Sequence, residues 1–239
     1  QPSFVNAAGG DFHPTGNWVS RVALFTIPDY GWDLAVPAGT NSNAVPADKG
    51  GVSRTGQNAP GAYANPPVST QAETFYSNGT QDGWILENSE NGNAGGTFNF
   101  TSTVFNLGDN AADKQYRTIL HFNTSRLPDN AVITKVTLKI KRSGASIGTD
   151  PFTTHGLLYV DIINGTFSAN SALQLGDFQA AASKNAVGTI PNAPTSDWYS
   201  KIWNSGIFSY INKTGLTQFR LRFQTDDNDD NSADYMKFF

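Results

Sequence analysis

The chain has 239 residues, of which 15% are charged, a formal net charge of −4 and no cysteine. The mild negative charge argues against a nucleic-acid-binding protein, which usually carries a strong basic excess. The lack of thiols excludes disulfides and Cys-ligated metal sites. No apolar run approaches the roughly 20 residues of a membrane helix, so we predict no membrane insertion.

The acidic residues are unevenly divided, with 17 Asp and only 3 Glu. Asp favours turns and loops whereas Glu favours helices, so this bias predicts β-structure with long loops. Abundant Gly, Asn, Ser and Thr agree with that interpretation and are typical of a secreted, extracellular or cell-surface protein.

Residues 1–68 are irregular, with Gly9-Gly10, scattered prolines and the turn-rich stretch "NAPGAYANPPVSTQ" at the end. From about Glu73 the chain changes to short runs with period-two alternation. We therefore predict an irregular segment over 1–68 and a β-sandwich module over 69–239.

Alternating runs mark the predicted strands of that module. In "VITKVTLKIKR" (132–142) one face carries Val132, Thr134, Val136, Leu138 and Ile140, and the other carries lysines. "TQFRLRFQ" (217–224) is expected to place its apolar residues inward and Arg220 and Arg222 outward. Further strands are predicted over "KQYRTILHF", "GLLYVDII" and "ADYMKFF", and short helices only within 171–183 and 200–213. The pattern predicts an all-β, antiparallel sandwich, jelly-roll-like, of about eight to ten strands.

Two segments resemble known families. "PSFVNAAGGDFHPTGN", "WDLAVPAGT" and "ADKGGVSRTGQNAPGAYA" together resemble the C-terminal end of a right-handed parallel β-helix protein. Residues 93–142 are similar to DNRLRE-type modules, which are β-sandwiches like carbohydrate-binding modules. These modules share a sequence pattern, and the residues that match it here are Leu120, Phe122, Leu127, Pro128, Ile133 and Leu138. At one position of the pattern Val136 replaces the usual small residue. The resemblance implies an extracellular module appended to polysaccharide-degrading or cell-surface proteins.

The stretch "QTDDNDDNSADYMKF" (224–238) is the most acidic in the chain. Its D-x-N-x-D spacing is typical of calcium loops, although the stretch lacks the Gly and Glu of an EF-hand. We predict calcium binding here, with Glu73, Asp82 or Glu87 as additional ligands; a solvated hairpin end is the alternative. The predicted metal ligands are Asp226, Asp227, Asn228, Asp229, Asp230 and Asp234.

Aromatic residues in Gly-, Asn- and Ser-rich surroundings are candidates for stacking on sugar rings. They are Trp84, Trp198, Tyr199 and Trp203, and "SDWYSKIW" (196–203) is the best local candidate. Burial in the sandwich core is the alternative for each. Lys135, Lys139, Lys141 and Arg142, beside Arg220 and Arg222, are a further candidate for binding an anionic polysaccharide; a solvated outer face is the alternative.

No catalytic motif is present: G-x-S-x-G, H-E-x-x-H and a Walker loop are all missing, and the three histidines are widely spaced. Glu87 and Glu90 form the carboxylate pair considered for hydrolysis. We predict a non-catalytic carbohydrate-binding module stabilised by calcium, with a polysaccharide or glycan as partner. The alternatives are a cell-surface, adhesion or filament subunit that assembles with its own copies through strand edges, and an accessory part of a polysaccharide-degrading enzyme.

Overall fold

The computed structural model describes residues 4–6, 11–14 and 71–239. The chain divides into two units, Gln1–Ala72 and Glu73–Phe239. In the first unit, β1 (Phe4–Asn6) pairs antiparallel with β2 (Asp11–Pro14). The rest of the segment that resembles a β-helix end, and the predicted boundary after residue 68, lie outside the described residues.

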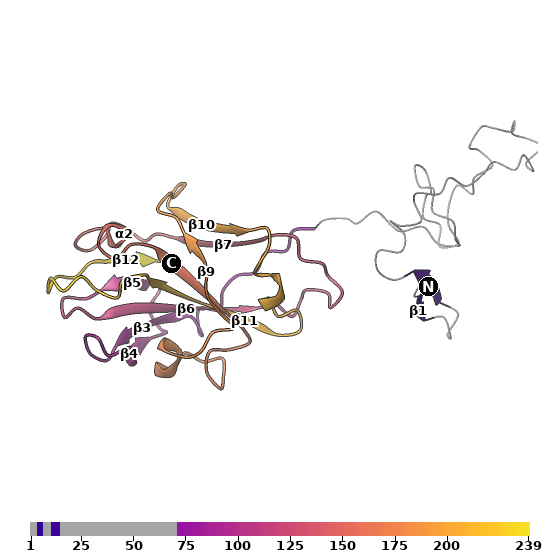
Figure 1. The fold of residues 1–239 in the computed structure, drawn as a ribbon, viewed down its shortest axis with the longest axis horizontal. Helices are drawn as coiled ribbons and strands as arrows, with labels where there is room; N and C mark the ends of the chain where they lie inside the picture. The colour runs from indigo at the N-terminus through magenta and orange to yellow at the C-terminus, as the bar shows by residue number, and fades with distance from the viewer. Residues whose placement is uncertain (1–3, 7–10, 15–70) are drawn as a thin grey trace, which may run out of the picture. The chain divides into compact units, whose positions relative to one another are not determined.

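The second unit is an antiparallel β-sandwich, as predicted (Figure 1). One layer is an eight-stranded sheet in the order β12-β5-β6-β11-β8-β9, with β3 added at β6 and β4 at β3; the other is the pair β10-β7. The elements are β3 (Gly83–Glu87), β4 (Gly95–Asn99), β5 (Phe105–Asp109), β6 (Gln115–Asn123), β7 (Val136–Lys141), α2 (Pro151–Thr154), β8 (Leu158–Asn164), η2 (Leu175–Phe178), β9 (Lys184–Ile190), β10 (Trp198–Trp203), η3 (Phe208–Tyr210), β11 (Leu216–Phe223) and β12 (Tyr235–Phe238).

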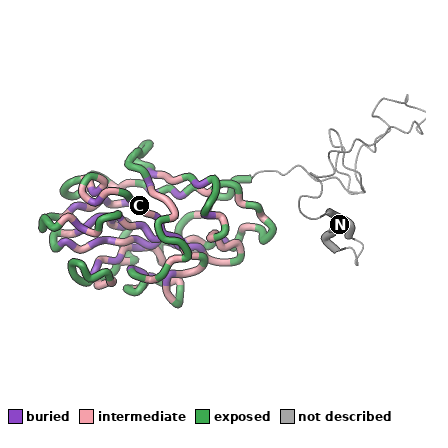
Figure 2. The backbone as a smooth tube through the Cα atoms, viewed as in Figure 1, coloured by how far each residue is buried: buried purple, intermediate pink, exposed green. Residues whose placement is uncertain are grey.

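The main core lies between the two layers. Along β11 the inward residues Phe219, Leu221 and Phe223 are buried as predicted, and β7 contributes Leu138 and Ile140. Figure 2 shows buried residues concentrated along the strands and exposed residues in the connecting loops. Alternation of apolar and polar side chains therefore decides which face of each of these strands is inside.

The strand predicted from residue 132 begins only at Val136. Val132 is 83% exposed, so it contributes nothing to the core. The preceding residues are held in a turn, because Ala131 N donates to Pro128 O and the Lys213 ammonium donates to the carbonyl oxygens of Asp129 and Ala131. Tertiary hydrogen bonds thus shorten the strand that the alternation alone predicts.

A second, smaller core covers the outer face of the large sheet. Ile85 of β3 and Ile119 of β6 pack there against Phe167, Leu173 and Phe178 from the segment that follows β8. The prediction that the arginines of β11 point into solvent is therefore wrong for one of them: Arg220 is only 4% exposed. Arg222 on the same face is half-buried, and both guanidiniums bind Asp161 of β8.

Both segments predicted to hold a short helix form a single 3₁₀ turn instead. Within 171–183 the turn is η2, where Asp177 accepts a hydrogen bond from Gln174 N. Within 200–213 the first residues complete β10, and η3 follows. No helix in the described part of the chain is long and apolar enough to cross a membrane.

The last strand is not an open edge. β12 pairs with β5 on one side. On its other side Ser143 N donates to Lys237 O, Phe239 N donates to Lys141 O, and Ile147 N and Tyr235 N each donate to the other residue's carbonyl. β12 therefore offers no unpaired edge for the assembly through strand edges that was considered as an alternative.

Candidate functional site

The acidic stretch 224–234 connects β11 to β12, which lie apart in the sheet, so it is not a simple hairpin end. Two local turns shape it: Asp227 accepts from Asp229 N at 3.2 Å, and Asp230 accepts from Ser232 N at 2.7 Å. These turns leave Asp229 and Asp230 exposed, whereas Asp227 is 7% exposed. The predicted ligands therefore differ in exposure: Asp229 and Asp230 are exposed, Asp226 and Asn228 are half-buried, and Asp227 and Asp234 are buried.

Asp234 is the most deeply buried of the predicted ligands, at 1% exposed. Its Oδ1 accepts from Thr149 N at 2.6 Å, and its Oδ2 accepts from Asn228 Nδ2 at 3.3 Å. The loop that carries Thr149 approaches closely at Gly148, which has φ +67°; a Cβ there would lie 2.3 Å from Asp234 Oδ1. Both oxygens of Asp234 already have protein partners, so its role is to join these segments.

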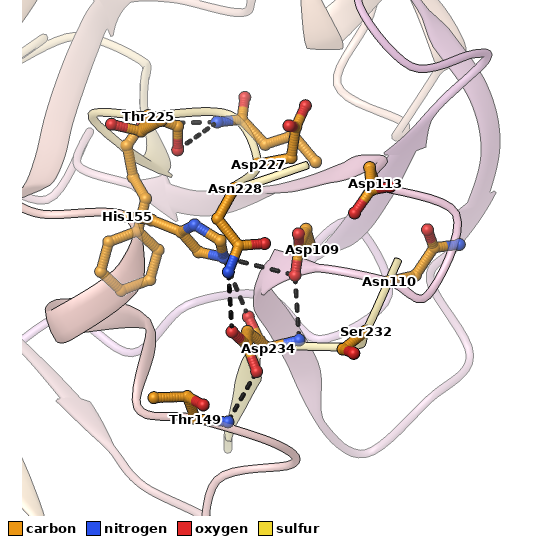
Figure 3. Close-up of polar contacts among 12 residues, drawn as sticks. Asp109, Asn110, Asp113, Thr149, His155, Thr225, Asp227, Asn228, Ser232 and Asp234 are labelled. Atoms are coloured by element: carbon orange, nitrogen blue, oxygen red, sulfur yellow. Dashed lines mark hydrogen bonds and ion pairs between the residues drawn. The ribbon is translucent and has the colours of Figure 1, made fainter. Parts of the chain in front are cut away.

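The turn between β5 and β6 brings two further carboxylates to the same place (Figure 3). Asp109, fully buried at the end of β5, accepts from Asp234 N at 2.9 Å. Asp113, 3% exposed, accepts from Asn231 N at 3.1 Å. Neither residue is among the predicted ligands. The signal in the sequence was the short D-N-x-x-D turn of residues 109–113, but nothing local shows that it meets a loop more than a hundred residues later.

His155 completes this group. Asp150 caps the short helix α2 by accepting from Phe152 N at 3.0 Å, and His155 follows at the helix end. Its Nε2 lies 3.3 Å from Asp109 Oδ1 and 3.2 Å from Asp234 O. Burial by itself lowers the pKa of this imidazole, but the hydrogen bond to Asp109 and the negative charge of that carboxylate outweigh it and raise the pKa.

The pKa of Asp227 is raised by burial and by neighbouring negative charges. Burial is the main reason that the pKa of this carboxyl rises to about 6, and the charges of Asp226, Asp229 and Asp113 add to it. The region therefore concentrates negative charge in a place with little access to water, which is the electrostatic condition for binding a cation.

The residues expected to complete a calcium shell lie elsewhere. Glu73 pairs with Arg126 at 2.9 Å, and Glu87 is buried beside Gln115 N. Asp82 accepts from His121 N at 2.6 Å, and burial raises its pKa to about 6. In the described ranges, no three His, Asp or Glu side chains already converge as metal ligands.

The four candidate aromatics have different environments. Tyr199 and Trp203 are 1% and 6% exposed and belong to the main core, and the Trp203 indole donates to Val187 O at 2.9 Å. Trp84 is half-buried with its ring edge against Tyr116. The expectation of exposed rings is therefore wrong for Tyr199 and Trp203, because β10 alternates and turns both toward the core.

Trp198 differs, since it is 40% exposed. It lies on the outward face of β10, and its register partner is Lys141 of β7. The Lys139 ammonium lies 4.8 Å from the centre of its indole ring. We call the outward residues Lys139, Lys141, Trp198, Ser200 and Ile202 the β7–β10 face.

The basic residues do not form the single surface that the sequence suggested. Lys139 and Lys141 lie on the β7–β10 face, but Arg220 and Arg222 belong to the eight-stranded sheet and bind Asp161. Arg142 pairs with Asp197 at 3.2 Å. Of the basic and aromatic candidates, the structure brings together Lys139, Lys141 and Trp198.

No protein-family model matches this chain, and no curated protein sequence is significantly similar to it.

Proposed function

We propose that the sandwich is a non-catalytic, extracellular carbohydrate-binding module that binds an acidic polysaccharide on the β7–β10 face. The observation that carries this proposal is the exposed indole of Trp198 between two lysines, Lys139 at its ring and Lys141 opposite it in register.

The chemistry of the face matches a uronate-containing chain. An indole ring stacks on the apolar face of a pyranose, and an ammonium group attracts the sugar carboxylate. Ser200 lies opposite Lys139 in the register. It supplies a hydroxyl between the aromatic Trp198 and the aliphatic Ile202 on the same face of β10. Ile202, 48% exposed, extends the apolar surface along the strand.

The neighbouring charges support an anionic ligand over a neutral one. The carboxylate nearest to Trp198 in sequence is Asp197, and Arg142 pairs with it at 3.2 Å. That pair is close to neutral, so the positive charges of Lys139 and Lys141 dominate the face. A lysine side chain on the surface has several rotamers, so Lys139 can leave the indole to a sugar ring and move to its carboxylate.

Trp198→Ala is expected to weaken binding of an acidic polysaccharide such as polygalacturonate at least about tenfold, because it removes the stacking ring. The measurement is affinity electrophoresis or calorimetry, with the fold checked by circular dichroism. Lys139→Ala with Lys141→Ala is expected to weaken binding comparably and to abolish its salt dependence.

The matched control is Phe98→Ala, because Phe98 is similarly exposed, at 39%, but belongs to β4. This variant should bind like the wild type. If no acidic polysaccharide binds the wild type, or if Trp198→Ala binds as well as Phe98→Ala, the proposal fails.

A second candidate function, self-assembly at a cell surface, has one observation in its favour. Among the described strands β4 pairs only with β3, so its other side has no strand partner, although Gly95 N at its start donates to Gln179 Oε1 at 3.3 Å. Two exposed rings, Phe98 on β4 and Phe100 directly after it, stack on each other with centroids 6.0 Å apart. An open strand edge beside exposed aromatics can be covered by a strand from another copy.

Under this second candidate, the wild type forms concentration-dependent oligomers in analytical ultracentrifugation, and a Phe98→Lys, Phe100→Lys double variant remains monomeric. Trp198→Ala should oligomerise like the wild type. If the wild type stays monomeric at millimolar concentration, self-assembly through the β4 edge is ruled out.

A further inference from the structure

Four buried carboxylates lie together between the β5–β6 turn and the 224–234 loop. Asp109, Asp113, Asp227 and Asp234 are 0%, 3%, 7% and 1% exposed. Within the described part of the chain, the ion pairs include none between these four and a lysine or arginine; His155 pairs with Asp109. One imidazole cannot balance four buried negative charges, and a buried charge without compensation is strongly unfavourable.

Two oxygen atoms in this cluster have no hydrogen-bond partner although both are buried: Asp109 Oδ2 and Asn228 Oδ1. Each is an acceptor, so neither can satisfy the other. In Figure 3 the carboxamide oxygen of Asn228 points toward the Asp109 carboxylate. Two such acceptors need a hydrogen-bond donor or a cation beside them, and the surrounding buried carboxylates favour a cation.

The orientation of the Asn228 amide is set by its nitrogen. Nδ2 donates to Asp230 Oδ2 at 2.9 Å and to Asp234 Oδ2 at 3.3 Å. Turning the amide over would lose both hydrogen bonds and place the oxygen against two carboxylates. The two hydrogen bonds of Nδ2 therefore hold the oxygen on the side of Asp109.

We propose that a calcium ion binds between Asp109 Oδ2 and Asn228 Oδ1, with the carboxylates of Asp113 and Asp227 beside it. Calcium takes six to eight oxygen ligands in flexible geometry and accepts amide oxygens and water, whereas magnesium demands a regular octahedron. The four carboxylates lie in one region, but in the described residues no three of them converge on one point, so water and backbone carbonyls supply much of the shell.

The site differs from the one that the acidic stretch suggests by itself. Only Asn228 and Asp227 come from that stretch, and Asp109 and Asp113 come from the β5–β6 turn. The ion therefore joins two segments that are far apart in sequence, close to where β12 pairs with β5. It does not depend on the proposed carbohydrate function, because the β7–β10 face contributes no ligand.

The first experiment compares wild type and Asp109→Asn, dialysed against EDTA and then titrated with CaCl₂. The wild type is expected to bind one equivalent of calcium and to gain roughly 4 °C or more in melting temperature. In Asp109→Asn, Oδ1 still accepts from Asp234 N, while the new amide group takes the place of the orphan oxygen and donates to Asn228. This variant should be more stable than the wild type in EDTA and should not respond to calcium.

The matched control is Asp229→Asn, an equal loss of charge at an exposed carboxylate in the same loop, where φ is +55° and Asn is well tolerated. It should bind calcium like the wild type. Asn228→Ala removes the second ligand, and its calcium affinity should fall at least roughly tenfold. This variant tests the site even if Asp109→Asn does not fold.

Three results would overturn the proposal. They are a wild type with the same melting temperature in EDTA and in calcium, an Asn228→Ala variant with unchanged calcium affinity, and an equal response to magnesium. The readouts are calcium stoichiometry by equilibrium dialysis and thermal unfolding. Neither involves a sugar, so failure here is distinguishable from failure of the carbohydrate proposal.

Discussion

Replacing Asp161 by alanine is expected to lower the free energy of unfolding by about 3–5 kcal/mol. The Asp161 carboxylate is fully buried and lies 2.9 Å from Arg220 and 3.0 Å from Arg222, whose side chains are 5% and 22% exposed. Removing it leaves Arg220 as a buried cation whose remaining partners are neutral oxygens, including the carbonyls of Asp177 and Ala180. An unpaired buried charge is the costliest kind of single-residue loss.

The chain offers a matched control for that variant. Asp197 also binds an arginine, Arg142, but this pair is on the surface, with side chains 54% and 33% exposed. Surface pairs contribute about 0–1 kcal/mol, so Asp197→Ala should have a small effect. Urea unfolding at neutral pH measures both. If both variants lower the free energy of unfolding equally, the buried Asp161–Arg220 pair contributes no more to stability than the surface pair.

The effect of Asp161 also depends on pH in a defined direction. Burial by itself would raise its pKa, but hydrogen bonds from Arg222 and Ala186 N and the positive charges of Arg220 and Arg222 lower it below the ordinary 3.8. A lowered pKa means that the ionised carboxylate stabilises the fold above pH 3.8 and that this contribution disappears as the pH falls through the folded value. The difference between wild type and Asp161→Ala should therefore shrink below about pH 4.

Trp203→Ala is expected to cost about 3–5 kcal/mol of stability, as for other large aromatic residues removed from a core. Its indole is 6% exposed and donates to Val187 O at 2.9 Å. The ring also packs against Gly188, where an added Cβ would lie 2.7 Å from the indole nitrogen. The variant therefore loses apolar burial, leaves a cavity and removes the hydrogen-bond partner of a carbonyl.

Trp198→Ala is the comparison for this second prediction, since both indoles belong to β10 and lie five residues apart. Trp198 is 40% exposed, so its removal should cost less than about 1 kcal/mol. Unfolding followed by circular dichroism avoids the loss of a fluorophore. If Trp198→Ala destabilises the protein as much as Trp203→Ala, the outer ring is structural and its availability to a ligand is in doubt.

Local pattern was sufficient for the interior of the strands. The alternation of β11 correctly predicted that Phe219, Leu221 and Phe223 point inward. The alternation did not predict the burial of Arg220, because it shows only that Arg220 is on the face opposite to Phe219 and Leu221. Whether that face meets water depends on the segment after β8, which covers it with Phe167 and Phe178.

The aromatic candidates show the same limit at shorter range. Within "SDWYSKIW" the sequence alone did not separate Trp198 from Trp203, since both are tryptophans beside polar residues. The strand places Tyr199 and Trp203 on the core side and Trp198 on the outside. A strand was not predicted for these residues, so its period of two was not applied to them.

The amino-acid sequence by itself determined the all-β class, the interior of the longest strands and the acidic character of the 224–234 stretch. These properties depend on composition and on contacts between near neighbours, which alternation and turn residues encode. Only the tertiary structure decided that Asp109 accepts from Asp234 N, that Arg220 is buried, and that Trp198 lies beside Lys139. Those contacts depend on the order of strands in the sheet, which is set by the burial of the whole chain at once.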